Sequence, residues 1–442
     1  MAFFAAAPTV VAMELRLVTD RAFTSSLTKE VAGVMSVIKS STFQLLSNPG
    51  ADRSVAYDDA GRADILSDDA FRVARQEIMS WPGYGETPVR KLTKLAHAIG
   101  VRQILYKDEG DRFGLGSFKA LGGAYAVFRL IQQELKQRTG VEVRSTDLVS
   151  RSFADMTAGI TVTCATDGNH GKSVAWGAQK FGCRCVIYVH ASVSEARCRA
   201  IASYGAEVRR VAGNYDDAVR QAASDAVKHG WHVVSDTSYE GYVNVPRDVM
   251  QGYSIMVEEA LNQASVKPTH VFVQGGVGGL AAAVCSHLWQ RYGKQRPTYV
   301  VVEPDKADCL YRSAISGEPT VVHGALDTIM AGLACGEVSL LAWKILQPGA
   351  DAFMTISDEA AAEAMRILAD AQFGDEPVVA GESAVAGLAG LILAAGDPSS
   401  RADLALGPES VVLLFGTEGA TDPEVYQRIV GRSADVVKAA AA

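Results

Sequence analysis

HVFVQGGVGGLAAAV, residues 270–284, is the stretch that decides the fold. It begins as an apolar strand-like run, passes through a cluster of glycines and continues in small residues typical of a helix. This order predicts a strand–loop–helix unit, in which the loop follows the carboxyl end of a parallel strand. The N–H groups of such a loop and of the helix start attract anions, so phosphate is the natural guest of residues 275–279.

The same alternation of strand and helix runs through most of the chain. Strands separated by helices of 10–18 residues predict an α/β fold with mostly parallel sheets. A chain of 442 residues is too long for one ordinary core, so two domains are expected. Strands are expected at 185–190, 207–211, 231–236, 269–274, 298–304 and 410–416, and helices at 171–182, 214–230 and 246–263. The polar segment 137–159 is expected to be a surface insertion.

Composition and charge exclude several classes of function. The net charge is −8, with 42 basic and 50 acidic residues and no basic block, which argues against nucleic acid and anionic membranes as partners. The longest apolar run near the carboxyl end, 387–396, is half of what a membrane span needs. The seven cysteines show no metal-ligand spacing, so we expect no metal and reduced thiols in a cytoplasmic protein. A disulfide between Cys309 and Cys335 stays open at this point.

The glycine loop by itself is ambiguous. Residues 276–281 satisfy G-x-G-x-x-A, the dinucleotide fingerprint, and Glu303 ends the next strand where a ribose-binding acid belongs. An NAD-dependent oxidoreductase is therefore an alternative. A tight turn that binds no ligand is another.

Lys119 separates these alternatives. It lies in KDEGDRFGLGSFKALGGAYAV, residues 107–127, where Ser117-Phe118-Lys119 opens an alanine-rich helical run. Hydride transfer does not need a lysine at a helix start, whereas pyridoxal phosphate (PLP) enzymes need an amine for a Schiff base with the cofactor aldehyde. Desolvation and the positive helix end favour the neutral, nucleophilic amine.

Three further loops place polar side chains at predicted strand ends. TCATDGNHGKSVAWGAQ, residues 163–179, offers Asp167 and Asn169, with His170 interpreted as structural. Asp236 begins DTSYEGY, and Thr417 lies in FGTEGATD after the last strong strand. An aspartate can move protons, and an asparagine or a threonine can hydrogen-bond a cofactor ring. Capping of a helix or a turn is the simpler interpretation of Asp167 and Asp236.

Together these motifs resemble those of the fold-type II PLP enzymes, the group of tryptophan synthase β and threonine dehydratase. Within that group the chain is similar to the diaminopropionate ammonia-lyases over about residues 80–430. The chain departs from the family's pattern at Gly116-Ser117 before Phe118, at an additional early glycine in the 275–279 loop, and at Tyr239. Of these residues, Ser117 and Tyr239 are candidates for the lining of the substrate pocket. The resemblance is carried by PGYGETPVRKL, YKDEGDRFGLGSFKALGGAYA, ATDGNHGKSVAW, DTSYEGY, VPRDVMQGY, VEPDKADCLYRS, IMAGLACGE and GTEGATD.

The resemblance implies a role for each candidate residue. Lys119 would hold PLP, and Lys119 and Asp167 would accept the α-proton from opposite faces of the substrate, so that both D and L isomers react. Asp236 would lie near the second amine and help to bind or protonate it. The cofactor-binding set would be Phe118, Lys119, Asn169, Gly275, Gly276, Val277, Gly278, Gly279 and Thr417, with Thr417 facing the pyridine nitrogen.

The resemblance also implies an activity and an architecture. The reaction would be α,β-elimination of 2,3-diaminopropionate to pyruvate and two ammonia, the alternatives being a lyase or dehydratase for a serine- or threonine-like amino acid and a non-catalytic PLP binder. Two three-layer α/β domains would enclose the cofactor in a cleft, in a homodimer. The expected boundaries are 1–60 for an N-terminal extension, 61–120 with 241–442 for the large PLP domain, and 121–240 for a small inserted domain.

Overall fold

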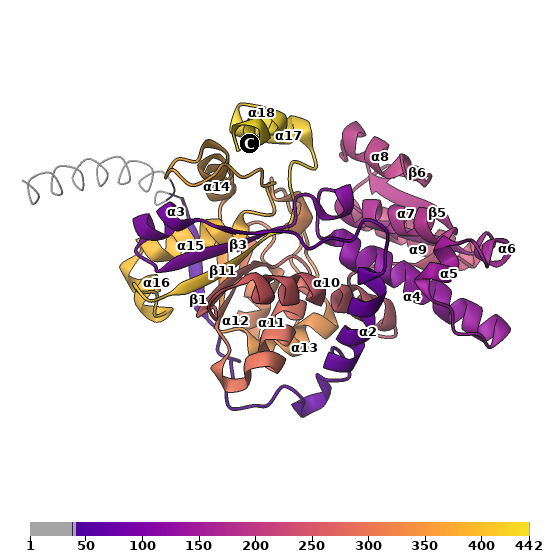
Figure 1. Cartoon of the computed structure of the whole chain (residues 1–442), viewed down its shortest axis with the longest axis horizontal. Coiled ribbons are helices and arrows are strands. Elements are labelled where there is room, and N and C mark those ends of the chain that lie inside the picture. Colours follow the sequence, from indigo (N-terminus) through magenta and orange to yellow (C-terminus); the bar gives the residue numbers. More distant parts are fainter. Residues whose placement is uncertain (1–37, 39–40, 442) are drawn as a thin grey trace, which may run out of the picture.

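Two twisted, mostly parallel sheets form the framework of the protein (Figure 1). The computed structural model describes residue 38 and residues 41–441. The larger sheet has the order β1-β10-β9-β8-β11-β3-β2, and only its edge strands β1 and β2 are antiparallel to their neighbours. Its strands are β1 (Phe43–Ser47), β10 (Ala352–Ile356), β9 (Thr298–Pro304), β8 (His270–Gln274), β11 (Val411–Gly416), β3 (Gln103–Asp108) and β2 (Val89–Lys91). The fold is therefore α/β, as predicted.

Both faces of the larger sheet are covered by helices. Successive side chains of a strand point to opposite faces, and in β8 Val271 and Val273 join one buried cluster while Phe272 joins the other. Near-continuous apolar strands such as these are typical of parallel sheets buried on both sides. The first cluster contains α10 (Asn244–Gln263), α11 (Gly279–Tyr292) and α13 (Leu340–Gly349), and the second contains α3 (Thr93–Ile99), α14 (Asp358–Asp370), α15 (Ala386–Gly396) and α17 (Pro423–Val430).

The smaller sheet lies beside the first and is drawn in magenta in Figure 1. Its order is β6-β5-β4-β7, all parallel, with β6 (Glu207–Val211), β5 (Arg184–His190), β4 (Thr161–Ala165) and β7 (His232–Val233). On one face α7 (Asn169–Phe181) and α4 (Lys119–Thr139) join it to the main core, and on the other α9 (Tyr215–His229) covers Val186 and Tyr188.

The differences from the predicted elements have local causes. Strand 231–236 shortens to residues 232–233, and segment 137–159 contains the end of α4 and two short helices, α5 (Ser145–Val149) and α6 (Ala154–Thr157). The expectation missed β1, β2, β3 and β10, which are short and lack an alternating pattern. All strands of the smaller sheet lie between 161 and 233, and β1 lies inside the expected N-terminal extension, whose first 37 residues are outside the described range. The domain boundaries stay a prediction.

Glycines allow α4 to approach two neighbouring helices backbone to backbone. A Cβ on Gly252 of α10 would lie 2.0 Å from the main-chain oxygen of Leu121 in α4, and one on Gly177 of α7 would lie 2.8 Å from Cα of Ala124 in α4. Real Cβ atoms do not come so close, so only glycine fits at either position. This packing fixes the start of α4, where Lys119 lies, relative to α7. No helix in the described part of the chain is long and apolar enough to cross a membrane.

Replacement of Gly252 by alanine should separate α10 from α4. We expect Gly252→Ala to destabilise the protein by about 2 kcal/mol or more, because the new methyl group meets backbone that cannot rotate away. Thermal unfolding followed by circular dichroism measures the loss. Gly407→Ala is the matched control, since no atom lies within 4 Å of its Cβ position. Equal melting temperatures for both variants would contradict the tight contact.

Candidate functional site

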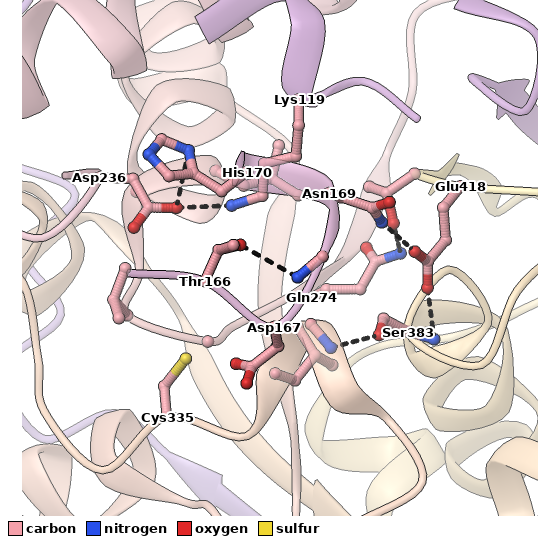
Figure 2. A pocket seen from close by; sticks show the side chains of 18 of the residues that line it. Lys119, Thr166, Asp167, Asn169, His170, Asp236, Gln274, Cys335, Ser383 and Glu418 are labelled. Carbon is pink, nitrogen blue, oxygen red and sulfur yellow. Dashed lines mark hydrogen bonds and ion pairs between the residues drawn. The ribbon is translucent and has the colours of Figure 1, made fainter. Parts of the chain in front are cut away.

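A pocket between the two sheets collects the loops that follow the strand ends. It is lined by residues 165–170 after β4, residues 274–277 and 279 at the end of β8, and Thr417 and Glu418 after β11. The carboxyl ends of parallel strands are where ligands bind in open α/β sheets. The glycine loop, the loop that carries Asp167 and Asn169 and the loop that carries Thr417 therefore meet in one place. Figure 2 shows their side chains converging with Lys119 at the start of α4.

Lys119, Asp236 and His170 form a polar group on one wall of the pocket. Nζ of Lys119 donates to Oδ2 of Asp236 at 2.6 Å, and Nδ1 of His170 lies 3.8 Å from the same oxygen. Figure 2 shows Asp236 reaching both partners. Nε2 of His170 is 2.8 Å from the main-chain oxygen of Val234, which holds the ring in place. His170, interpreted from the sequence as structural, thus also lines the pocket.

The ion pair decides the charge of the amine. Burial alone would lower the pKa of Lys119, but the carboxylate of Asp236 outweighs it and raises this pKa. Burial would likewise raise the pKa of Asp236, and the ammonium of Lys119 lowers it instead. The expectation that the helix start makes the amine neutral is therefore wrong for this structure, because it ignored a partner 117 positions away in the sequence.

Two aromatic rings lie near the amine of Lys119. The ring centroids of Phe118 and Tyr253 are 4.5 Å apart, and Nζ of Lys119 lies 5.5 Å and 5.8 Å from them. The hydroxyl of Tyr253 is buried and has no hydrogen-bond partner among the described residues. Phe118, predicted as a cofactor contact, lines the pocket.

The loop after β4 is ordered by Thr166 rather than by Asp167. Oγ1 of Thr166 accepts from the N–H groups of Gly168 and Gly171, both at 3.0 Å. Asp167 does not cap α7: its Oδ1 is 2.5 Å from Nε2 of His190. Asn169, the first residue of α7, donates from Nδ2 to Glu418. The simpler interpretation of Asp167 as a helix cap is therefore wrong.

The glycine loop after β8 is shaped by the residue that suggested a dinucleotide site. A Cβ on Gly275 would lie 2.5 Å from Cγ of Glu303. The Glu303 carboxylate is fully buried and accepts from the N–H groups of Leu310 and Tyr311 at 3.1 Å and 2.7 Å, at the start of α12 (Cys309–Ser316). Glu303 is thus occupied in capping a helix, which removes the ribose-binding argument for an NAD site.

Within this loop the predicted residues divide into two groups. Gly275, Gly276, Val277 and Gly279 line the pocket, whereas Gly278 does not. A Cβ on Gly278 would instead face Ala342, Leu310 and Leu346, and its φ of +98° favours glycine.

Thr417 is buried behind the glycine loop, beside a glutamine that the sequence analysis did not single out. Nε2 of Gln274 donates to Oγ1 of Thr417 at 3.3 Å, and Oε1 of Gln274 has no partner among the described residues. The main-chain oxygen of Thr417 accepts from the N–H of Phe118 at 3.0 Å, which links this loop to the start of α4.

Several lining residues were missed by sequence reasoning because they stand alone in ordinary segments. Glu418 was signalled by its place in GTEGATD, and Cys335 by IMAGLACGE. Conversely, Ser117 and Tyr239 do not line the pocket: Ser117 is buried beside it and Tyr239 is 53% exposed. Cys309 and Cys335 are free thiols. The missed set is Ala165, Thr166, Gly168, His170, Arg197, Tyr215, Tyr253, Gln274, Leu280, Gly332, Leu333, Cys335, Ser383 and Glu418.

The residues present fit PLP. Lys119 supplies a primary amine for the aldehyde, and the Gly275–Gly279 loop with the start of α11 supplies N–H groups for a phosphate. Tyr253, Gln274 and His170 each carry a buried polar atom without a partner among the described residues, as expected where a polar ligand completes the hydrogen bonding.

Comparison with known proteins agrees with this fit. Residues 80–415 match the family described as pyridoxal-phosphate dependent enzyme. The diaminopropionate ammonia-lyase of Escherichia coli K12 is 41% identical over 372 residues, covering 83% of this chain and 92% of the relative.

Two solved structures of the Escherichia coli diaminopropionate ammonia-lyase are similar throughout. One, in complex with the aminoacrylate-PLP azomethine reaction intermediate, has a TM-score of 0.78 at 38% identity and covers 88% of this chain and 97% of that one. The other, in complex with D-serine, has a TM-score of 0.80 at 38% identity and covers 89% and 99%.

Glu303 makes stability depend on pH. Burial raises the pKa of Glu303 to about 8, although two N–H groups lower it. The unfolded chain loses this proton at about pH 4.3, so stability should fall between there and about pH 8, by up to ~1.4 kcal/mol per pH unit. Glu303→Gln should remove this component, so the melting temperature of the variant should rise relative to that of the wild type as pH increases from 5 to 8. The exposed Glu318→Gln is the control, and parallel curves for all three proteins would refute the assignment.

Proposed function

We propose, since this chain belongs to the pyridoxal-phosphate-dependent enzymes and within them to the diaminopropionate ammonia-lyase family, that it converts 2,3-diaminopropionate to pyruvate and two ammonia by α,β-elimination. Family membership confirms the predictions of a fold-type II enzyme, of a lyase and of PLP as cofactor. It also makes the NAD-dependent alternative wrong.

One observation carries the proposal: the partly buried amine of Lys119 shares a pocket with two aspartates and a glycine loop. PLP, when bound, withdraws electrons from the substrate's α-carbon, so that its proton becomes acidic. The phosphate is assigned to residues 275–279, the ring oxygen to Asn169 and the pyridine nitrogen to Thr417. These assignments agree with the lining of the pocket, and Gly278 contributes only by shaping the loop.

The two aspartates have different environments and are assigned different tasks. Asp167 is 27% exposed and its carboxylate is held from one side by His190, so it suits an acceptor of the α-proton. Lys119 is assigned the same task for the opposite face of the substrate. Asp236 already binds an ammonium, that of Lys119, at 2.6 Å. A carboxylate in that position suits the β-ammonium of the substrate.

A second candidate keeps the chemistry but changes the leaving group. The Escherichia coli relative has been solved in complex with D-serine, so a dehydratase for a serine-like amino acid is the alternative. A hydroxyl leaving group has no positive charge, and it therefore gains little from Asp236. A small amino acid is the substrate in either case.

A cytoplasmic location and a homodimeric assembly are also proposed. The seven cysteines are all free thiols, which agrees with a cytoplasmic location. A homodimer is proposed by analogy with fold-type II enzymes, and light scattering of the purified protein would test it.

Activity and cofactor can be tested in one cuvette. The purified protein should show the visible absorbance of lysine-bound PLP and should release pyruvate from D- or L-2,3-diaminopropionate, read with a coupled assay. Lys119→Ala should lose both the band and turnover, because no other lysine of the described residues lines the pocket. Lys172→Ala, on α7 with its amine bound to the main-chain oxygen of Leu115, is the control and should keep the band. Pyruvate release by Lys119→Ala at the wild-type rate would refute the assignment.

Asp236→Asn distinguishes the two candidate substrates. Loss of a charge-assisted hydrogen bond of about 1.5–3 kcal/mol should lower kcat/KM for 2,3-diaminopropionate by about 10–100-fold. The value for D-serine should change far less, because its leaving group is uncharged. Asp403→Asn, at an exposed position on α16 (Pro398–Asp403), is the matched control. An equal loss with both substrates would show that Asp236 does not bind the leaving amine.

A further inference from the structure

The imidazole of His190 lies against the carboxylate of Asp167. Nε2 of His190 is 2.5 Å from Oδ1 of Asp167, and the side chains are 18% and 27% exposed. In the described part of the chain this is the only hydrogen bond of the Asp167 carboxylate, so Oδ2 has no partner there. Arg197 donates to the main-chain oxygen of Asp167 at 3.3 Å and thus holds the loop rather than the carboxylate.

Strand register places these two residues together. In the parallel pair of β4 and β5, Ala165 is opposite Tyr188, and the pairing continues when the N–H of Thr166 donates to the main-chain oxygen of Tyr188 at 3.0 Å. Two residues further along each chain stand Asp167 and His190. Asp167 lies in the bend between β4 and α7, and His190 is the last residue of β5, so the register of the two strands brings their backbones to the same edge of the sheet.

The carboxylate of Asp167 determines which nitrogen of His190 carries the proton, and Ser192 contacts the other nitrogen. Oγ of Ser192 is 3.0 Å from Nδ1 of His190. An ionised carboxylate can only accept, so Nε2 must donate to Asp167. In a neutral ring Nδ1 then accepts from the Ser192 hydroxyl, and Ser192–His190–Asp167 forms a chain of hydrogen bonds in one direction.

This chain of contacts leads from the pocket to a second, outer cavity. Asp167, Arg197 and Tyr215 line both spaces, whereas His190 and Ser192 line only the outer cavity. His190 therefore approaches Asp167 from outside the pocket and takes up no room that a substrate needs.

We propose that His190 is a positioning residue, which holds Oδ1 of Asp167 through Nε2–H so that Oδ2 stays directed at the α-proton of the substrate. The inference rests on the proposed function, in which Asp167 is the proton acceptor for one isomer and Lys119 for the other. A carboxylate fixed by a hydrogen-bonded third group keeps the geometry that proton transfer needs. Without the imidazole the carboxylate rotates freely, and the reaction of that one isomer slows.

The test uses the holoenzymes of the wild type and of Asp167→Asn, His190→Leu and His190→Gln. Both isomers of 2,3-diaminopropionate are supplied with hydrogen or deuterium at the α-carbon. Asp167→Asn first identifies the isomer that depends on Asp167. For that isomer His190→Leu should lower kcat by about 10–100-fold and raise the α-deuterium isotope effect, with KM within about threefold.

Two variants, His190→Gln and Ser192→Ala, keep the test independent of folding. His190→Gln retains an N–H donor and should recover most of the lost rate. Ser192→Ala removes only the partner of Nδ1, so a smaller loss with the same isomer is expected. His97→Leu, at an exposed position on α3, is the matched control and should leave both isomers unchanged.

The outcomes separate the positioning role from the proposed function. Equal losses on both isomers, or no loss in His190→Leu, would overturn the positioning role while the wild-type activity stands. Unchanged rates with both isomers in Asp167→Asn would also overturn the positioning role while the wild-type activity stands. Pyruvate from neither isomer in the wild type would instead refute the proposed function itself.

Discussion

Backbone contact between α4 and its neighbours is the constraint on which the site depends. Gly177 of α7 and Gly252 of α10 leave no room for a side chain against the backbone of α4. Because Lys119 opens α4 and Asn169 opens α7, the distance between these helices sets the distance between the two loops. A methyl group at either glycine would therefore act on the pocket as well as on the core.

The charges of the pocket are paired across the fold. Asp236 follows the smaller sheet and binds Lys119 at the start of α4, while Arg197 of α8 (Glu195–Ala202) reaches Glu382 at 2.8 Å, between α14 and α15. Burial and the neighbouring Glu418 raise the pKa of Glu382 to about 7, although Arg197 lowers it. Ionic contacts thus join the parts that carry the two sheets.

The glycine loop shows how one local pattern can serve two chemistries. G-x-G-x-x-A at 276–281 and the acid at 303 satisfied the dinucleotide fingerprint. In the folded protein the acid caps α12 and explains why residue 275 is glycine, since a Cβ there would meet Cγ of Glu303 at 2.5 Å. Motifs of this kind indicate an anion, but the position of the neighbouring strand end decides which ligand fits.

The sequence by itself determined the α/β class, the strand–loop–helix unit at 270–284, the helix that begins at Lys119 and the three loops that line the pocket. These are local properties, set by hydrophobic periodicity and by residues that follow a strand end. Only the tertiary structure decided that Asp236 keeps Lys119 charged, that His190 holds Asp167, that Gly278 faces the interior and that Tyr239 lies at the surface. Such pairings join residues far apart in the chain or depend on which way a side chain faces, and packing rather than local pattern selects them.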